Sequence, residues 1–362
     1  MSDIYRSAAG RTHRVAVIPA DGIGPEVIPE AVRALEAVAQ RHCVALELVS
    51  FDWGSEHYLD HGQVMPTGAV AQLATFDAIL AGPVGDPRIA DTVTAWGLIL
   101  TLRQAFDQYV NLRPVRLLPG VGGPLADIRP EAVDMVLVRE NTEGEYSGAG
   151  GRVHASHGAE LAVETSVFTR FGIDRIVRHA FEHAATRERR HVTSATKSNS
   201  LRHAMPLWDE VFARVSLDFP DVTTDSCLVD ALAARMVRDP ASLDVVVASN
   251  LFGDILSDLG AAVAGSLGIA PSANLDPSRR HPSLFQAIHG SAPDIAGQGI
   301  ANPIGEIWSA ALLLDFLGEP DAGAALLRAV EVSTANPATR TRDLGGTATT
   351  AQAGAAVRAA LG

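Results

Sequence analysis

RVAVIPADGIGPE, residues 14–26, indicates the fold class of this chain. Its first five residues are typical of a short buried strand, and PADGIGPE is typical of a glycine-rich turn into a helix, which we expect from about Glu26 to Gln40. Strand-like apolar runs and helical patterns then alternate along the chain. The expected strands are 46–51, 78–81, 135–138, 192–195 and 245–248, and the expected helices are 69–74, 172–186, 200–215, 231–238 and 254–264. This alternation predicts an α/β sheet with helices on its faces.

Composition limits the class of protein. With 362 residues, 47% of them hydrophobic, the chain fits about two domains. No apolar stretch reaches the roughly 20 residues that span a bilayer, and the charged N-terminus is unlike a signal peptide. Two cysteines, Cys43 and Cys227, suggest neither a disulfide framework nor a zinc site. A net charge of −13 argues against nucleic-acid or membrane partners, so we expect a cytoplasmic protein.

The glycine turn does not match a dinucleotide-binding fingerprint. Gly22 and Gly24 begin a GxGxxG pattern after a strand, but Val27 takes the place of the third glycine. No acidic residue stands clearly at the ribose-binding distance, and no Walker loop is present. The sequence therefore predicts a non-Rossmann arrangement, in which PADGIGPE is at least a tight strand-to-helix turn.

Lys197 is the single lysine beside 28 arginines. Arginine replaces lysine readily on a surface, but it cannot release a proton as an ammonium can. Lys197 is therefore a candidate general base, and the alternative is a solvated surface lysine.

Arg103, Arg113 and Arg139 are candidates for binding a substrate with two carboxylates, because guanidinium groups bind carboxylates bidentately. Arg139 directly follows the apolar run MVLV, at the strand edge where open α/β sheets bind ligands. Surface ion pairing is the alternative for any one of them. Tyr146 follows in a glycine-rich loop, and its phenol can deliver a proton if a nearby cation lowers its pKa. A loop tyrosine that only packs its ring is the alternative.

Asp254 and Asp258 lie four residues apart in SNLFGDILSDLG, on one face of the expected helix. Two stacked carboxylates repel each other, and a divalent cation removes that repulsion; oxygen ligands suit Mg²⁺ or Mn²⁺. Asp230 is a third candidate metal ligand. The alternative is a helix cap at Asp254 beside a solvated Asp258.

The segment 289–303, HGSAPDIAGQGIANP, is rich in small residues. Small residues allow a flat ligand to approach the backbone closely, and a plain surface loop is the alternative.

Together these segments resemble the β-decarboxylating dehydrogenases, the family of isopropylmalate, isocitrate, tartrate and D-malate dehydrogenases. The matching segments, in the family's order, are PADGIGPEV, FDQYVNLRP, VRENTEGEYSG, TSATKSN, ASNLFGDILSDL and HGSAPDIAGQGIANP. The resemblance implies an isopropylmalate dehydrogenase-like, non-Rossmann α/β fold of two domains, with the active site shared across a dimer. It places residues 1–108 and 265–362 in a large, cofactor-side domain and 109–264 in a small domain, with a dimerisation arm near 148–168.

The resemblance also implies residue roles. Arg103, Arg113 and Arg139 match carboxylate ligands, Tyr146 the proton donor and Lys197 the catalytic lysine. Asp230, Asp254 and Asp258 match the metal ligands, and Lys197 and Asp230 are expected to serve the neighbouring subunit. The expected NAD-binding residues are His289, Gly290, Ser291, Ala292, Asp294 and Asn302. The expected cofactors are NAD and Mg²⁺ or Mn²⁺, with a K⁺ requirement left open.

Asp294 favours NAD over NADP, because a carboxylate accepts hydrogen bonds from ribose hydroxyls and repels an added phosphate. The resemblance assigns TVTAWGLILTLRQ to substrate recognition, with Trp96 where isopropylmalate dehydrogenases have an acidic residue and with Ile99 and Leu100 at two leucine positions. The bulky Trp96 leaves room for malate but less for an isopropyl group. D-malate, converted to pyruvate and CO₂, is thus the expected substrate, with tartrate also open. Ile99 and Leu100 keep 3-isopropylmalate as an alternative. A catalytically silent regulatory subunit of a dehydrogenase complex is the more distant alternative. For the enzyme itself, the resemblance implies a homodimer or tetramer.

Overall fold

The computed structural model describes residues 11–125, 129–154, 156 and 158–362, and it divides into two compact units. Unit 1 contains the chain up to Gln108, Arg116–Pro130 and Ala261–Gly362, and unit 2 contains Tyr109–Val115 and Glu131–Gly260. We expected divisions after residues 108 and 264. Arg116–Pro130, expected in the small domain, belongs to unit 1, where Arg116 donates to Glu331 at 2.8 Å.

Unit 1 contains a five-stranded layer in the order β2-β1-β3-β12-β11. The pairs are parallel except for β11–β12, which is antiparallel. The strands are β1 (Thr12–Ile18), β2 (Ala45–Ser50), β3 (Ala78–Ala81), β11 (Pro271–Leu275) and β12 (Ser283–Ala287). β3, β11 and most of β1 are fully buried, as expected of strands covered on both faces.

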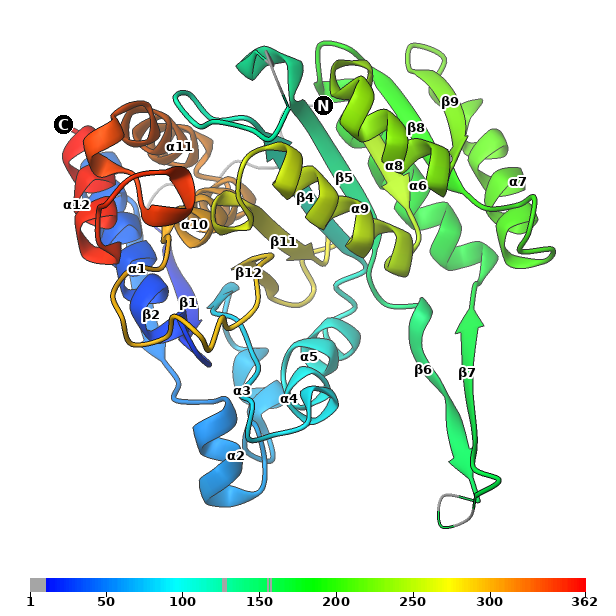
Figure 1. Ribbon diagram of the computed structural model, residues 1–362, viewed down its shortest axis with the longest axis horizontal. Coiled ribbons are helices and arrows are strands. Elements are labelled where there is room, and N and C mark those ends of the chain that lie inside the picture. Colours follow the sequence, from blue (N-terminus) through cyan, green and yellow to red (C-terminus); the bar gives the residue numbers. More distant parts are fainter. Residues whose placement is uncertain (1–10, 126–128, 155, 157) are drawn as a thin grey trace. The chain divides into compact units, whose positions relative to one another are not determined.

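The helices of unit 1 pack in two groups. α10 packs on β11 and β12 and also contacts α1 and α11, which in turn contact α12 (Figure 1). A separate apolar core joins Phe51 and Trp53 to α3 and α5. The bounds are α1 (Gly24–His42), α2 (Ser55–His61), α3 (Ala69–Leu73), α4 (Asp91–Gly97), α5 (Ile99–Ala105), α10 (Ile304–Leu317), α11 (Pro320–Ala335) and α12 (Thr350–Ala360).

Unit 2 contains strands in the order β4-β5-β10-β8-β9, and β5, β10, β8 and β9 pair in parallel. The strands are β4 (Val110–Arg116), β5 (Asp134–Glu140), β8 (His191–Thr196), β9 (Thr223–Leu228) and β10 (Val245–Ala248). The helices are α6 (Arg170–Thr186), α7 (Ala204–Ser216), α8 (Val229–Arg238) and α9 (Asn250–Val263). Parallel pairing places the carboxyl ends of β5, β8 and β10 at one edge, where chemistry-bearing side chains follow.

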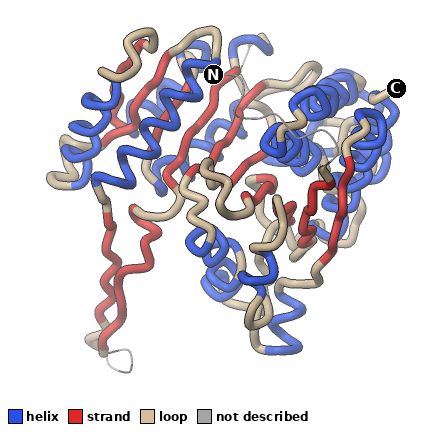
Figure 2. The backbone as a smooth tube through the Cα atoms, turned by 180° about the vertical axis from the view of Figure 1, so that it is seen from behind, coloured by secondary structure: helices blue, strands red, loops and turns tan. Residues whose placement is uncertain are grey.

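β6 (Gly144–Val153) and β7 (Leu161–Val167) form an antiparallel ribbon that extends away from the rest of unit 2 (Figures 1 and 2). β7 and most of β6 lie within the arm expected near 148–168. The side chains of β7 are exposed throughout, including Leu161 and Val163. Residues 155 and 157 of the expected arm lie outside the described residues. The role of the ribbon in dimerisation stays a prediction.

No helix among the described residues has the length and apolar character needed to cross a membrane.

Glu306 is an acidic residue fully buried in the otherwise apolar first turns of α10. Among the described residues, neither of its carboxylate oxygens has a hydrogen-bond partner at standard geometry, and the Ala287 backbone only partly opposes the effect of burial. Burial raises the pKa of Glu306 to about 8, because the charged form loses its hydration. The folded protein therefore holds this proton over a pH range in which the unfolded chain releases it.

We expect Glu306 to make the free energy of unfolding fall as pH rises from about 4.5 to about 8. The slope from this group approaches about 1.4 kcal/mol per pH unit, since the folded state binds the extra proton. In Glu306→Gln this contribution disappears, so the variant's melting temperature should rise relative to wild type at pH 8 and much less at pH 5. Calorimetric melting at both pH values tests this; a variant-to-wild-type difference equal at both would contradict it.

Candidate active site

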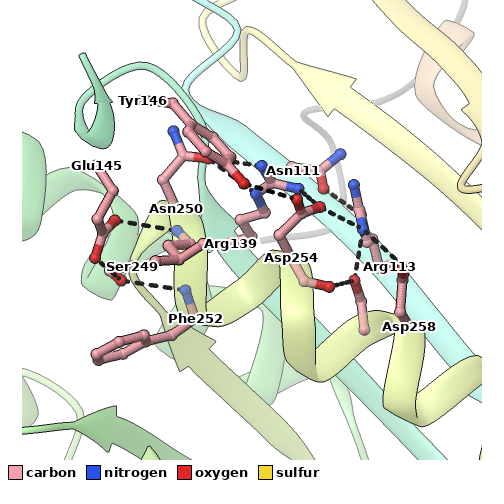
Figure 3. A network of polar contacts seen from close by, with 12 residues as sticks. Asn111, Arg113, Arg139, Glu145, Tyr146, Ser249, Asn250, Phe252, Asp254 and Asp258 are labelled. Atoms are coloured by element: carbon pink, nitrogen blue, oxygen red, sulfur yellow. Dashed lines mark hydrogen bonds and ion pairs between the residues drawn. The ribbon is translucent and has the colours of Figure 1, made fainter. Parts of the chain in front are cut away.

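Arg139 is the centre of a polar network at the carboxyl end of β5 (Figure 3). Its side chain is 1% exposed. Its Nε and Nη2 donate to Asn250 Oδ1 at 3.0 and 2.7 Å, and its Nη1 donates to Asp254 Oδ1. Gly253 makes this packing possible, because a Cβ at that position would lie 2.6 Å from the Arg139 Cβ. The missing side chain therefore lets α9 lie directly against the arginine.

The start of α9 is fixed by Glu145, which follows the turn after β5. The Glu145 carboxylate accepts hydrogen bonds from Ser249 Oγ and from the Leu251 backbone N–H, both at 3.0 Å. Asn250 Nδ2 donates to the Glu143 carbonyl at 2.9 Å. A carboxylate at this position satisfies helix N–H groups that have no partner within the helix. These contacts orient the helix that bears the two predicted metal-binding aspartates.

Arg113, on β4, is the second buried guanidinium of the network. Its Nε donates to Asn111 Oδ1 at 2.5 Å, and its Nη1 donates to Ser257 Oγ. The same Nη1 lies 3.3 Å from Asp254 Oδ1 and 4.0 Å from Asp258 Oδ1. The structure thus brings together two of the predicted arginines and two of the predicted aspartates, as Figure 3 shows.

The charges in this cluster shift one another's protonation. Burial lowers the pKa of Arg113 to about 10, and the neighbouring Arg139 cation adds to that shift. Burial also raises the pKa of Asp258, to which the Asp254 carboxylate contributes, while Arg113 opposes it. The two guanidiniums and two carboxylates are close enough for the charge of each to change the electrostatic potential that an anionic substrate or a cation would experience.

Asp254 and Asp258 provide oxygen ligands on one helix face, with side chains 36% and 57% exposed. Hard oxygen donors with open access suit Mg²⁺ or Mn²⁺. Within the described part of the chain, no three His, Cys, Asp or Glu side chains gather as a metal site. Two carboxylates from this chain fit a divalent cation only if further ligands come from a substrate, water or another subunit.

Tyr146, on β6, donates its phenolic proton to Asp254 Oδ2 at 3.1 Å. The Arg139 guanidinium carbon lies 5.5 Å from the ring centroid. The sequence left open whether a nearby cation lowers the pKa of this phenol, and in the structure the pKa is not lowered. Burial raises the pKa of Tyr146, and the Asp254 carboxylate adds to this, outweighing the lowering effect of Arg139.

Lys197 and Asp230 form a separate pair in unit 2. Lys197 directly follows β8, and its Nζ donates to Asp230 Oδ1, in the first turn of α8, at 2.6 Å. The hydrogen bond from Lys197 lowers the pKa of Asp230. Their side chains are 26% and 66% exposed. Asp230 therefore does not join Asp254 and Asp258 within one chain, and its role as a metal ligand stays a prediction.

The remaining predicted substrate residues lie in unit 1. Arg103, on α5, is 6% exposed. Ile99 belongs to the apolar core of that unit, whereas Trp96 and Leu100 are partly exposed. Their roles in substrate binding stay predictions.

A pocket of about 410 Å³ lies in unit 1 beside the predicted NAD loop. Of the predicted loop residues, His289, Ala292 and Asn302 line it. The other lining residues are Ile23, Ser266, Gly268, Ile295, Ile300, Ala301, Arg342 and Asp343. Ser291 is buried and its carbonyl accepts a hydrogen bond from the Ile23 N–H at 2.9 Å, while Gly290 and Asp294 are exposed. The predicted loop therefore forms one wall of a real pocket.

The pocket is apolar with a few fixed polar groups, which is typical of cofactor sites. Burial lowers the pKa of His289, so the ring is neutral near pH 7, and its Nε2 is enclosed without a hydrogen-bond partner in the described structure. Asp343 accepts hydrogen bonds from Asn302 Nδ2 at 3.0 Å and from Ser266 Oγ at 2.5 Å. An apolar slot with an unpartnered imidazole nitrogen fits a dinucleotide.

Sequence reasoning missed the residues that hold the site in place. Asn250, Ser257 and Asn111 support the arginines, and Arg342 and Asp343 line the pocket. Asn250 alone had a usable signal, since it directly follows the apolar strand that leads into the aspartate helix. The others contact the site across large sequence separations, which no local pattern encodes.

Comparisons with known proteins show the family to which this chain is related. The family model of isocitrate/isopropylmalate dehydrogenase matches residues 14–357. A D-malate dehydrogenase [decarboxylating] of Escherichia coli is 52% identical, with 96% of this chain and 98% of the relative covered. A tartrate dehydrogenase/decarboxylase of Pseudomonas putida is also 52% identical, with 95% and 96% covered. The isocitrate dehydrogenase structure from Methylococcus capsulatus has a TM-score of 0.87 at 34% identity, covering 96% of this chain and 99% of that one.

Proposed function

The chain belongs to the isocitrate/isopropylmalate dehydrogenase family and is an enzyme, and we propose that it oxidises and decarboxylates D-malate to pyruvate and CO₂ with NAD. Tartrate is the second proposed substrate. The observation that carries the proposal is the cluster of buried Arg113 and Arg139 with Asp254 and Asp258. Such a cluster suits an anionic hydroxy diacid bound beside a divalent cation, and both named relatives act on such compounds.

The arginines position the substrate. Arg113 and Arg139 are each held by an asparagine, so their guanidinium groups are ordered before a substrate binds. A bound Mg²⁺ or Mn²⁺, held by Asp254 and Asp258, would act as a Lewis acid on the hydroxyl and then the keto oxygen. The Arg113 and Arg139 cations favour a bound substrate carboxylate and stabilise the negative charge that develops on the substrate in the transition state.

Lys197 and Tyr146 move the protons in this proposal. The Lys197 amine accepts the proton of the substrate hydroxyl, and the hydride passes to NAD from the carbon that bears this hydroxyl. Tyr146 gives a proton to the carbon from which CO₂ has left. We assign Lys197 and Asp230 to the site of a neighbouring subunit, with the β6–β7 ribbon as the dimerisation arm. The exposed apolar side chains of β7 support that assignment.

NAD is proposed over NADP because the exposed Asp294 carboxylate repels a 2′-phosphate. Arg342, which lines the unit 1 pocket, carries the opposite charge, so NAD and NADP must be compared directly. The alternative of a non-catalytic subunit does not suit a chain in which each matched catalytic position is filled.

The test is initial-rate NAD reduction by the purified enzyme with Mn²⁺, comparing D-malate, tartrate and 3-isopropylmalate by kcat/KM. We expect D-malate or tartrate to exceed 3-isopropylmalate by about 10-fold or more, the discrimination that one bulky pocket residue such as Trp96 provides. NAD should likewise exceed NADP. Preference for 3-isopropylmalate would overturn the assignment of Trp96 and leave the arginine, metal and lysine chemistry in place.

A further inference from the structure

Glu26 links the first turn of α1 to the distant loop at 289–303. Its carboxylate accepts backbone N–H hydrogen bonds from Gly297 and from Gly299, the latter at 2.7 Å. Both glycines have positive φ, 77° and 65°, and lie outside any helix or strand. Two backbone donors that no ladder satisfies thus meet the two oxygens of one side chain.

These two hydrogen bonds fix the part of the loop that lies between two residues lining the unit 1 pocket. Gly297 and Gly299 stand in the sequence between Ile295 and Ile300, which both line the pocket. The Gly299 carbonyl accepts a hydrogen bond from the Thr350 N–H at 2.9 Å, so the loop is held from both sides. Glu26 contributes the contacts from the PADGIGPE turn.

Residues on either side of Glu26 also contact the loop 289–303. Ile23 and Val27, one turn apart on the buried side of this segment, form a small apolar cluster with Ala301, against which Ile295 packs. Apolar packing alone does not set the path of a glycine-rich loop, since glycine samples more backbone conformations than any other residue. A bidentate carboxylate supplies the missing directional restraint.

We propose that Glu26 is a positioning residue for the dinucleotide: it orders the loop 289–303 before the cofactor binds. This inference rests on the proposed function, in which that loop binds NAD. A loop ordered in advance loses less conformational entropy on binding, so Glu26 acts on cofactor affinity and not on the chemical steps. The expected signature is a change in Kd and KM for NAD with kcat preserved.

The variants are Glu26→Ala, which removes both acceptors, and Glu26→Gln, which keeps one acceptor and turns an N–H donor toward the other glycine N–H. The control is Glu36→Gln, on the exposed side of the same helix. We expect the Kd of NAD, measured by titration calorimetry without substrate, to rise about 10-fold in Glu26→Ala and less in Glu26→Gln. Glu36→Gln should match wild type, and kcat at saturating NAD should stay within about 2-fold in all.

Amide hydrogen exchange without NAD separates this proposal from the proposed function. The peptide covering 289–303 should exchange faster in both Glu26 variants and return toward wild type when NAD saturates them. An unchanged Kd in Glu26→Ala, or unchanged exchange in this peptide, overturns the positioning role. A wild-type protein that binds neither NAD nor NADP overturns the proposed function instead. An unchanged kcat together with faster exchange in this peptide identifies the effect of Glu26 as ordering of the loop.

Discussion

Lys197→Met should lower kcat/KM for D-malate by about 1000-fold or more, the upper range of what a positioned proton acceptor contributes. Methionine keeps the length and much of the volume of lysine but cannot accept a proton. The chain has no second lysine, so no neighbouring amine can take over. The ion pair with Asp230 shows that Lys197 is held in one place and does not extend freely into solvent. NADH formation under single-turnover conditions measures the hydride step directly.

Two further variants distinguish proton transfer from charge alone. Lys197→Arg keeps the cation and an ion pair with Asp230 but does not lose a proton near neutral pH, so it should be as inactive as Lys197→Met. Tyr146→Phe should still form NADH in the first turnover, while protonation of the enol carbon to give pyruvate slows. Retention of a tenth or more of wild-type kcat/KM by either Lys197 variant would contradict the assignment of Lys197 as the base.

The strands that carry the site were predictable because they are apolar runs. Those expected at 135–138, 192–195 and 245–248 are the cores of β5, β8 and β10. The family match and the isocitrate dehydrogenase structure confirm the predicted isopropylmalate dehydrogenase-like fold. The dimer that shares its site stays a prediction.

β11 and β12 escaped prediction because their polar residues are buried. Ser272, Asn274 and Ser283 are completely buried in these strands. Their burial is balanced by hydrogen bonds, such as Asn274 Nδ2 to the Leu284 carbonyl at 3.2 Å. A pattern that equates burial with hydrophobicity cannot recognise such strands.

Helix ends were harder to predict than helix positions. The helix expected to begin at Asp254 begins at Asn250, because the Glu145 carboxylate accepts a hydrogen bond from the backbone N–H of Leu251 in the first turn. This contact joins residues 106 positions apart. It also removes the alternative of Asp254 as a helix cap, since Asp254 lies inside α9. Its carboxylate is instead available to Arg139 and Tyr146.

The protonation of Tyr146 could not be predicted from the sequence for a similar reason. Proximity to Arg139 was a reasonable expectation, but the sign of a pKa shift depends on burial and on every nearby charge together. Asp254 accepts the Tyr146 hydrogen bond and opposes the cation. That balance exists only once β6 and α9 are packed.

Asp254→Asn should weaken Mn²⁺ binding by more than about 100-fold, because even the loss of an outer-shell partner costs 10- to 100-fold. The Asp254 carboxylate contacts Arg113, Arg139 and Tyr146 within this cluster. Its replacement also leaves two buried guanidiniums with one fewer negative charge, so the variant should lose about 2 kcal/mol of stability. Metal titration followed by calorimetry and thermal melting measures both effects.

Asp258→Asn is the matched control, because it removes the other carboxylate of the same helix face. Asp258 is 57% exposed and reaches only Arg113, at 4.0 Å. We therefore expect Asp258→Asn to weaken Mn²⁺ binding while the melting temperature of the metal-free protein stays close to that of wild type. Both variants should bind Mn²⁺ more weakly than wild type. Only Asp254→Asn should also be less stable, because only Asp254 neutralises the fully buried Arg139. Wild-type Mn²⁺ affinity in Asp254→Asn would rule out this helix face as the metal site.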